Sequence, residues 1–298
     1  MTGNRKRVRH PASSQWLLVG STLFSLSAFA ANSLFCRLAL KDGGIDPVAF
    51  TAIRLLGGSL FLWLLLQLRR TSPAGGSWRG GISLFVYAYL FSLAYIQLDA
   101  GAGALILFGA VQLTMFALAW KSGEKLRAAV VIGMLIAFSG LIILLVPGSH
   151  APPLKSALAM VVAGMAWGAY SILGKGSVNP IGDTAGNFVR SLPLIGVAAA
   201  VALVQGAMSL TPSGVFYAIA SGVLASGAGY AVWYSIMGKL GAQTAATLQL
   251  GVPILASIGG VLFLSEPISM RLLIASLVVL GGIAIAILGP RRKTASAN

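Results

Sequence analysis

Long apolar stretches separated by short loops most strongly limit what this chain can fold into. A bilayer core about 30 Å thick needs roughly 20 apolar residues for each helical crossing. Only 9% of the residues are charged, compared with about 25% in soluble domains. Backbone polar groups in lipid must bond to one another, and the stretches lack the strict alternation of barrel strands. We therefore predict an all-α integral membrane protein with ten transmembrane helices. The predicted crossings are residues 16–40, 47–68, 80–98, 100–120, 126–146, 154–176, 184–204, 212–237, 241–264 and 268–289.

The basic residues are distributed unevenly between the predicted loops. With the N-terminus placed in the cytoplasm, fifteen of the 21 Lys and Arg residues fall in cytoplasmic segments, and only Lys41, Lys155 and Arg271 fall in outside loops. The positive-inside rule therefore predicts that both termini are cytoplasmic. The same rule accounts for the net charge of +15, and we expect no nucleic-acid partner because no soluble domain is left to hold one.

The first crossing has features of a signal peptide. A basic start precedes an apolar run that ends in small residues at Ala30, which is the pattern of a cleavage site. The apolar run continues to Leu40, however, and is then long enough to span the membrane. We expect the segment to remain as the first crossing.

The side chains that catalysis or metal binding would need are scarce. Cys36 is the single cysteine, and the two histidines, His10 and His150, fall in the N-terminal tail and a loop. A membrane enzyme would need a nucleophile–base pair or a metal cluster. We therefore expect no enzyme activity, no metal and no cofactor.

The chain contains two copies of one unit. A shift of 142 residues places LDAGAGALILFG (residues 98–109) over LGAQTAATLQLG (residues 240–251), and Glu124 over Glu266. Nearby offsets place Arg37 over Lys175 and Arg54 over Arg190. Each copy has five crossings, so the second enters the membrane inverted, as in many transporters. The predicted domains are a basic tail (1–15), repeat 1 (16–148), repeat 2 (154–290) and a second basic tail (291–298).

Aromatic stripes mark the faces expected to line a central cavity. Residues three and four apart share one face of a helix, and such spacing relates Trp167 to Tyr170, Phe91 to Tyr95, and Tyr230 to Trp233. Tyr87 extends the second stripe. Helix packing and interfacial aromatic belts are the alternative interpretations. The predicted substrate-binding residues are Asn32, Phe91, Tyr95, Trp167, Tyr170, Tyr230, Trp233 and Gln249.

Two polar features fall within the predicted crossings. Asn32 either lines the cavity or bonds a neighbouring helix. Pro253 has no N–H for the carbonyl of Gln249, so that carbonyl and the Gln249 amide could together hold a substrate ammonium; a simple kink is the alternative.

Four residues are predicted to have gating or structural roles. Arg54 and Arg190 lie about two turns into their crossings, from which long side chains can reach the near surface. Lys175 lies at a crossing end, where it could close the mouth of the cavity, as could Arg37. Pro253 completes the set.

The whole pattern resembles the drug/metabolite transporter superfamily, EamA type. The resemblance rests on ten crossings, two repeats, the glutamates of SGEKL and LSEPI, and the stretch GYAVWYSIMGKLGA. Among its members, the chain is most similar to the YddG-type exporters of aromatic and other neutral amino acids. The resemblance implies a monomer in the bacterial cytoplasmic (inner) membrane that exports small molecules by alternating access. It also implies a central cavity lined mainly by crossings 1, 3, 4, 6, 8 and 9.

Other functions of the same fold remain as alternatives. An exporter of drugs or lipophilic cations would also suit an aromatic lining, and a channel or a membrane enzyme is less favoured. Sugar phosphates would need several inward Arg or Lys groups. The six acidic residues fall in loops or at crossing ends, which favours facilitated diffusion over proton coupling; they are Asp42, Asp46, Asp99, Glu124, Asp183 and Glu266.

Overall fold

The computed structural model describes residues 11–70, 75–123, 127–148, 151–206, 208–240, 245 and 248–288. Glu124 and most of both predicted tails lie outside the described residues. Within these ranges the regular structure is helical, apart from one isolated β-bridge between Ile45 and Leu210. The helices are α1 (Pro11–Leu40), α2 (Pro47–Arg69), α3 (Trp78–Tyr95), α4 (Ala100–Lys121), α5 (Ala128–Leu145), α6 (Leu154–Leu173), α7 (Pro180–Val204), α8 (Pro212–Ala220), η1 (Ser221–Ala228), α9 (Gly229–Leu240), α11 (Gly251–Leu264) and α12 (Met270–Leu288).

The predicted all-α membrane fold is confirmed. Eight segments are long and apolar enough to cross a bilayer, and α8, η1 and α9 together form one of them. The other two predicted crossings correspond to α3 and to the shorter apolar helix α11. Most helices begin within a few residues of the predicted position. The largest shift among fully described starts is at α7, which begins at Pro180 because Asn179 caps it and proline suits the first helical turn.

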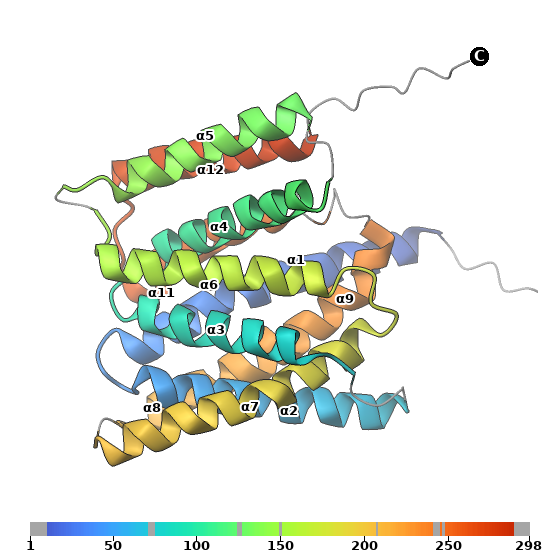
Figure 1. Cartoon of the computed structure of the whole chain (residues 1–298), viewed down its shortest axis with the longest axis vertical. Helices are drawn as coiled ribbons and strands as arrows, with labels where there is room; N and C mark the ends of the chain where they lie inside the picture. The colour runs from blue at the N-terminus through green and yellow to red at the C-terminus, as the bar shows by residue number, and fades with distance from the viewer. Residues whose placement is uncertain are drawn as a thin grey trace, which may run out of the picture.

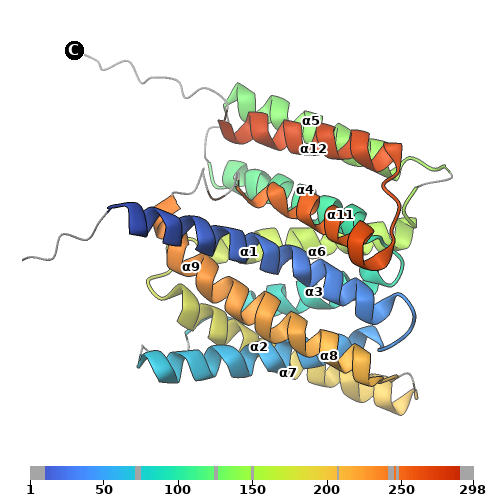
Figure 2. The same ribbon diagram turned by 180° about the vertical axis from the view of Figure 1, so that it is seen from behind.

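The helices lie side by side with their connecting loops gathered at two ends (Figures 1 and 2). At one end, Ile45 pairs with Leu210 and Ser156 Oγ donates to Gln97 Oε1 at 2.9 Å. At the other, the N–H of Gly75 donates to the carbonyl of Gly182 at 3.0 Å. Each of these contacts joins residues in loops or first helical turns that the sequence assigns to the same side of the membrane. Following the predicted orientation, we call these the outer and the inner end.

Polar side chains fix where several helices start. Asp46 Oδ1 accepts the N–H groups of Val48 and Ala49 at 2.9 Å each, and Thr211 Oγ1 accepts that of Gly214 at 3.1 Å. Such caps satisfy N–H groups that have no partner within the helix. Since caps and prolines occur at the loop ends, the turns of the bundle are encoded locally.

The packing pairs follow the relation between the two repeats. The last helices of the two copies, α5 and α12, pack against each other, and so do the second helices, α2 and α7. In the same way, α3 packs on α6, while the η1 and α9 segment packs on α1. Exchanging the two copies leaves this set of pairs unchanged, as a two-fold arrangement of inverted repeats requires.

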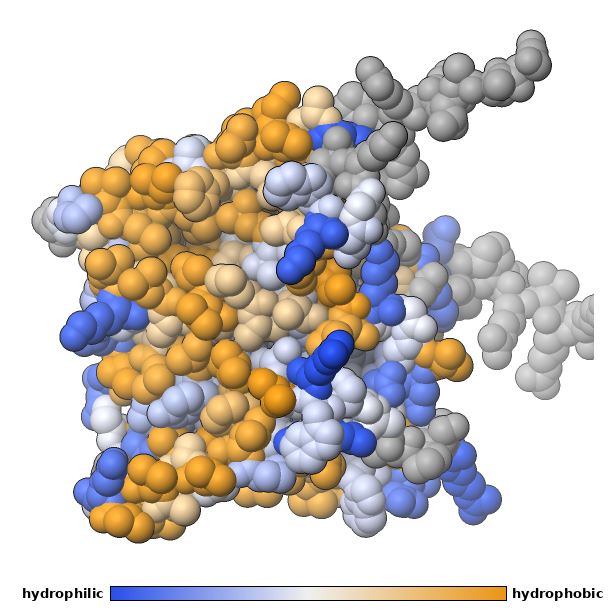
Figure 3. All heavy atoms as spheres, viewed as in Figure 1, coloured by the Kyte–Doolittle hydropathy of each residue, from blue (hydrophilic) through white to orange (hydrophobic). Residues whose placement is uncertain are grey.

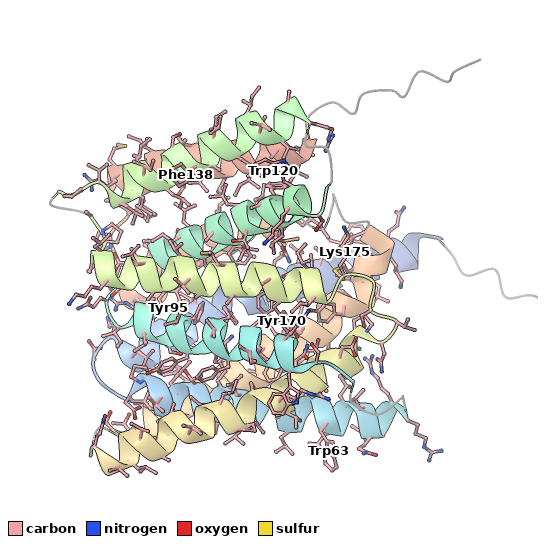
Figure 4. The ribbon with its side chains drawn as sticks, in the orientation of Figure 1. Trp63, Tyr95, Trp120, Phe138, Tyr170 and Lys175 are labelled. Carbon is pink, nitrogen blue, oxygen red and sulfur yellow. The ribbon has the colours of Figure 1, made fainter. Side chains whose placement is uncertain are left out.

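The outer surface of the bundle is apolar between its two ends. The face in Figure 3 is hydrophobic over most of its width, and hydrophilic residues gather mainly toward the inner end. Trp63, Trp120 and Phe138 point away from the bundle (Figure 4) and are 50%, 69% and 55% exposed. Such large exposed apolar side chains suit contact with lipid.

A π-helical segment interrupts the eighth crossing. In η1 each hydrogen bond spans five residues rather than four, so residues five apart come to one face. Ser221 and Ser226 are so placed, and both are buried. The segment also approaches α2 closely, because a Cβ on Gly222 would lie 2.5 Å from the carbonyl oxygen of Arg54. This wide turn therefore directs two hydroxyls toward α1 and α2.

Candidate substrate-binding cavity

A small cavity lies between six of the crossings near the centre of the bundle. It has a volume of about 30 Å³, which is enough for one or two water molecules. The lining comes from α1, α3, α4, α6, the η1 and α9 segment and the residues before α11, the crossings that the resemblance implies. The lining residues are Phe29, Asn32, Ser33, Tyr87, Phe91, Leu107, Phe108, Trp167, Ala225, Tyr230 and Gln249.

Five of the eight predicted binding residues line this cavity. They are Asn32, Phe91, Trp167, Tyr230 and Gln249. The other three do not line the cavity but pack against rings that do. Tyr95 packs edge-on against Phe91 with 4.7 Å between ring centroids, and Tyr170 stacks on Trp167 at 5.0 Å. Trp233 packs edge-on against Phe29 at 5.7 Å.

Six lining residues were not among the predicted set. Tyr87 and Phe29 do fall on recognisable faces, since Tyr87 is one turn before Phe91 and Phe29 is three residues before Asn32. Leu107, Phe108 and Ala225 come from stretches without a polar or aromatic stripe, so the sequence holds no local signal for them.

Trp167 is the centre of the aromatic wall. Its ring centroid lies 4.8 Å from that of Tyr87, 5.0 Å from Tyr170 and 5.2 Å from Tyr230. These are the separations of favourable ring pairs. Ligand sites usually have volumes of about 300–1,000 Å³, so the rings must separate before an organic molecule can enter. As the structure has it, the cavity is too small for an organic molecule.

A hydrogen-bond network lies behind the rings. Ser221 Oγ donates to Asn32 Oδ1 at 2.6 Å, and Asn32 Nδ2 donates to the hydroxyl of Tyr87 at 3.3 Å. Arg54 Nη2 donates to the same hydroxyl at 3.1 Å, while its Nε donates to Ser226 Oγ at 3.2 Å. The network joins α1, α2, α3 and η1, and it includes two cavity residues, Asn32 and Tyr87.

The two repeat-related arginines differ. Arg190 Nη1 donates to the backbone carbonyls of Gly75 at 2.6 Å and Gly186 at 3.0 Å, so its side chain reaches the inner end. Arg54 was also expected to be able to reach the near surface, and this is wrong: it is 1% exposed. Ser226 and Tyr87 hold its guanidinium inside the bundle instead.

Pro253 interrupts the hydrogen bonding of the ninth crossing. Leu250 is a turn residue between helical residues 248–249 and α11, and its φ of −63° and ψ of −19° stay in the right-handed helical region. Proline cannot donate to the carbonyl four residues back, which explains an interruption beside Gln249. The interruption therefore lies next to a residue that lines the cavity.

An ionic latch closes the outer end. Arg37 Nε donates to Glu266 Oε1 at 3.0 Å, and Glu266 Oε2 accepts the N–H of Ala100 at 2.8 Å. Arg37 also donates to the carbonyls of Tyr95 and Ile96 and lies 3.5 Å from Asp99. Burial raises the pKa of Glu266, against the opposing effects of the Ala100 N–H and of Arg37. We call Arg37, Asp99, Ala100 and Glu266 the outer latch.

Lys175, the repeat mate of Arg37, is exposed at the inner end (Figure 4). Its expected mouth-closing role stays a prediction, because Glu124, the mate of Glu266, lies outside the described residues. Among the residues that the structure describes, no group of three or more His, Cys, Asp or Glu is placed to hold a metal ion.

A larger cavity of about 240 Å³ opens at the outer end. Its walls come from the loops around Asp99, Pro153 and Pro267 and from residues of α4, α5 and α12. It lies at one end of the bundle and is lined largely by loop residues. Both repeats contribute to each cavity, so the position decides: the central cavity is the better candidate for a transport site because it lies between six crossings and away from both ends of the bundle.

Comparison with known proteins identifies the family. The model of the EamA-like transporter family matches residues 154–288. The chain is 52% identical to an uncharacterized protein of Pseudomonas aeruginosa over 91% of this chain and 94% of that one. It is also 26% identical to an uncharacterized transporter of Archaeoglobus fulgidus, over 92% and 98% of the two chains. This chain belongs to the EamA-like transporter family.

More distant similarities of this EamA-like transporter are to a named efflux pump and to a solved fold. A probable amino-acid metabolite efflux pump of Escherichia coli is 23% identical over 72% of this chain and 76% of its own length. A crystal structure with 22% identity has the same fold, with a TM-score of 0.64 over 90% of this chain and 98% of the other. The EamA-like protein is thus a multi-pass membrane transporter of small molecules.

Proposed function

We propose that this EamA-like transporter exports neutral amino acids, above all those with aromatic side chains, and that the central cavity is its binding site. The observation that carries the proposal is the cavity itself, whose lining combines the rings of Trp167 and Tyr230 with the amide residues Asn32 and Gln249. Aromatic faces suit an apolar or aromatic side chain, and amides suit the polar ends of a small amphipathic molecule. The Escherichia coli relative, a probable amino-acid metabolite efflux pump, supports the same substrate class.

The ammonium group of such a substrate has suitable partners on the second repeat. Gln249 is part of the lining, and its backbone carbonyl cannot receive a hydrogen bond from Pro253. The faces of Trp167 and Tyr230 also attract cations. In this proposal Gln249 and the neighbouring rings hold the ammonium end.

The proposed mechanism is alternating access between an outward-open and an inward-open state, in which the two repeats exchange their conformations. The outer latch joins α1, the loop before α4 and the loop after α11, and its release would open the outer end. Helix pairs that are exchanged by the two-fold relation can adopt the converse arrangement. The five acidic residues in the described part of the chain lie at helix ends or in loops, which supports export down a gradient. We place both termini in the cytoplasm of a bacterium and take the monomer as the working unit.

Counterflow in proteoliposomes tests this function. Liposomes with purified protein are loaded with unlabelled phenylalanine, leucine or tetraphenylphosphonium, and uptake of the labelled compound is followed with and without a proton gradient. We expect transient accumulation of phenylalanine that saturates and needs no gradient. Gln249→Ala should slow it, whereas the matched variant Gln67→Ala, at an exposed position of α2, should not.

The other outcomes have clear meanings. Accumulation of tetraphenylphosphonium alone would favour the lipophilic-cation exporter, and flux without counterflow would favour a channel. Phenylalanine counterflow at the parent rate in Gln249→Ala would refute the assignment of the binding site.

A further inference from the structure

Arg54 is a buried cation beside the cavity, and no acidic side chain among the described residues pairs with it. It lies in α2 and is 1% exposed. Both ion pairs found among the described residues belong to Arg37 at the outer end. A charge within a membrane-spanning helix is expensive, and such residues usually pair with an opposite charge or mark a substrate pathway. The absence of a carboxylate partner in the described part of the chain therefore needs an explanation.

The groups that surround Arg54 are neutral. Its guanidinium carbon lies 5.1 Å from the ring centroid of Tyr87 and 5.2 Å from that of Phe91. Ser226 and the Tyr87 hydroxyl accept two of its hydrogen bonds, while Nη1 has no hydrogen-bond partner in the part of the chain that the structure describes. Ring faces and hydroxyls offset part of the burial cost but leave the positive charge in place. Since Tyr87 and Phe91 line the cavity, that charge lies directly behind its wall.

The network turns donors toward the cavity. The Tyr87 oxygen accepts hydrogen bonds from both Arg54 and Asn32. A phenol oxygen has two acceptor sites and one O–H, so the hydroxyl hydrogen of Tyr87 remains available to donate. Asn32 uses one lone pair of its carbonyl oxygen for Ser221 and one N–H for Tyr87, so its second N–H is a further free donor beside one remaining lone pair. On this wall the cavity offers donors backed by a positive charge, which is the complement of an anion.

We propose that Arg54 is the counter-charge for a carboxylate of the transported molecule. The carboxylate accepts hydrogen bonds from Tyr87 and Asn32, and Arg54 stabilises it from behind the ring. Arg54 acts through Tyr87 and is a positioning residue that sets specificity. This inference rests on the proposed site and narrows its substrates to amphipathic molecules with a carboxylate, which excludes lipophilic cations and simple amines.

Three matched ligands test the inference: phenylalanine, 3-phenylpropionate, which lacks the ammonium group, and phenethylamine, which lacks the carboxylate. Binding is measured as the ligand-dependent rise in the unfolding temperature of the purified full chain, since a ligand stabilises the state that it binds. We expect both carboxylates to bind the parent protein, and phenethylamine to bind about tenfold more weakly or not at all.

Variants then assign the preference to Arg54. In Arg54→Gln the preference for 3-phenylpropionate over phenethylamine should fall about tenfold, and in Tyr87→Phe it should also fall. The control Arg190→Gln removes the repeat-related arginine, which bonds backbone at the inner end, and should keep the parent preference. A purely structural role for Arg54 would change stability without changing this ratio.

The outcomes separate this inference from the proposed function. Equal binding of phenethylamine and 3-phenylpropionate by the parent, or no binding of any of the three, overturns the inference, as does an unchanged ratio in Arg54→Gln. If Arg54→Gln does not fold, two other measurements test the inference. They are the preference of the parent for 3-phenylpropionate over phenethylamine and the change of that preference in Tyr87→Phe, and an unchanged preference in Tyr87→Phe overturns the inference. Carboxylate binding without amino-acid counterflow would support the inference and refute the proposed function.

Discussion

Two adjacent glycines in α12 allow a sharp test of how the repeats pack. A Cβ added to Gly282 would lie 2.5 Å from the backbone nitrogen of Ala137 and 2.6 Å from the carbonyl oxygen of Gly133, both on α5. A Cβ added to Gly281 would meet nothing within 4 Å. Backbone atoms cannot rotate away as a side chain can, so Gly282→Ala must push α5 and α12 apart.

The expected magnitude follows from comparing the two substitutions. Overpacking costs about 1–3 kcal/mol, and occasionally more. Replacing Gly by Ala within a helix contributes about 1 kcal/mol in the opposite direction, and both variants share this gain. The difference in unfolding free energy between Gly282→Ala and Gly281→Ala should therefore be about 1–3 kcal/mol, with Gly282→Ala the less stable.

Thermal unfolding of the purified variants in detergent measures this difference. We expect Gly281→Ala to unfold at or above the temperature of the parent and Gly282→Ala to unfold several degrees below it. Equal unfolding temperatures for the two variants would refute the close approach of α5 to α12, and with it the pairing of the last helices of the two repeats.

Three further predictions concern the gate, the cavity wall and the topology. Glu266→Gln removes the negative charge that accepts a hydrogen bond from Arg37, and a hydrogen bond to a charged group is worth about 1.5–3 kcal/mol. Thiol labelling of cysteines introduced at the outer end of the cavity should therefore rise about tenfold. Unchanged labelling would show that the outer latch does not keep the outer end closed. Trp167→Ala should lower phenylalanine counterflow about tenfold because the substrate ring loses its main aromatic partner, with the lipid-facing Trp63→Ala as control; equal loss in both would point to a general folding defect. Val178→Cys, in the exposed loop between α6 and α7, should react with an impermeant thiol reagent only from the cytoplasmic side, and labelling from outside would reverse the orientation.

Local sequence patterns predicted the helices and one face of the cavity. Apolar length predicted the crossings but not every exact start: the Asn179 cap begins α7 at Pro180, four residues before the predicted position. The spacing of Trp167 and Tyr170 correctly placed two stacked rings on one face of α6. Both signals work because they act within a few residues of chain.

Long-range partners could not be predicted in this way. Arg54 stays buried because of Ser226 and Tyr87, which are 172 and 33 residues away in the sequence. Arg37 finds Glu266 at a separation of 229 residues. The π-helical turn that brings Ser226 into place lies in the small-residue stretch SGVLASGA, whose composition does not distinguish it from an ordinary helix. Identical positions in two repeats can therefore have different environments, as Arg54 and Arg190 show.

Photo-crosslinking with a reactive phenylalanine analogue tests the central cavity most directly. The analogue is irradiated with the full chain in proteoliposomes, with and without excess phenylalanine, and labelled peptides are identified by mass spectrometry. We predict that the labels prevented by phenylalanine fall on the peptides that carry Tyr87, Trp167 and Gln249. The account would be contradicted if phenylalanine prevented labelling only at other places. Such places are the outer cavity around Pro153 and Pro267 and the lipid-facing side of α5.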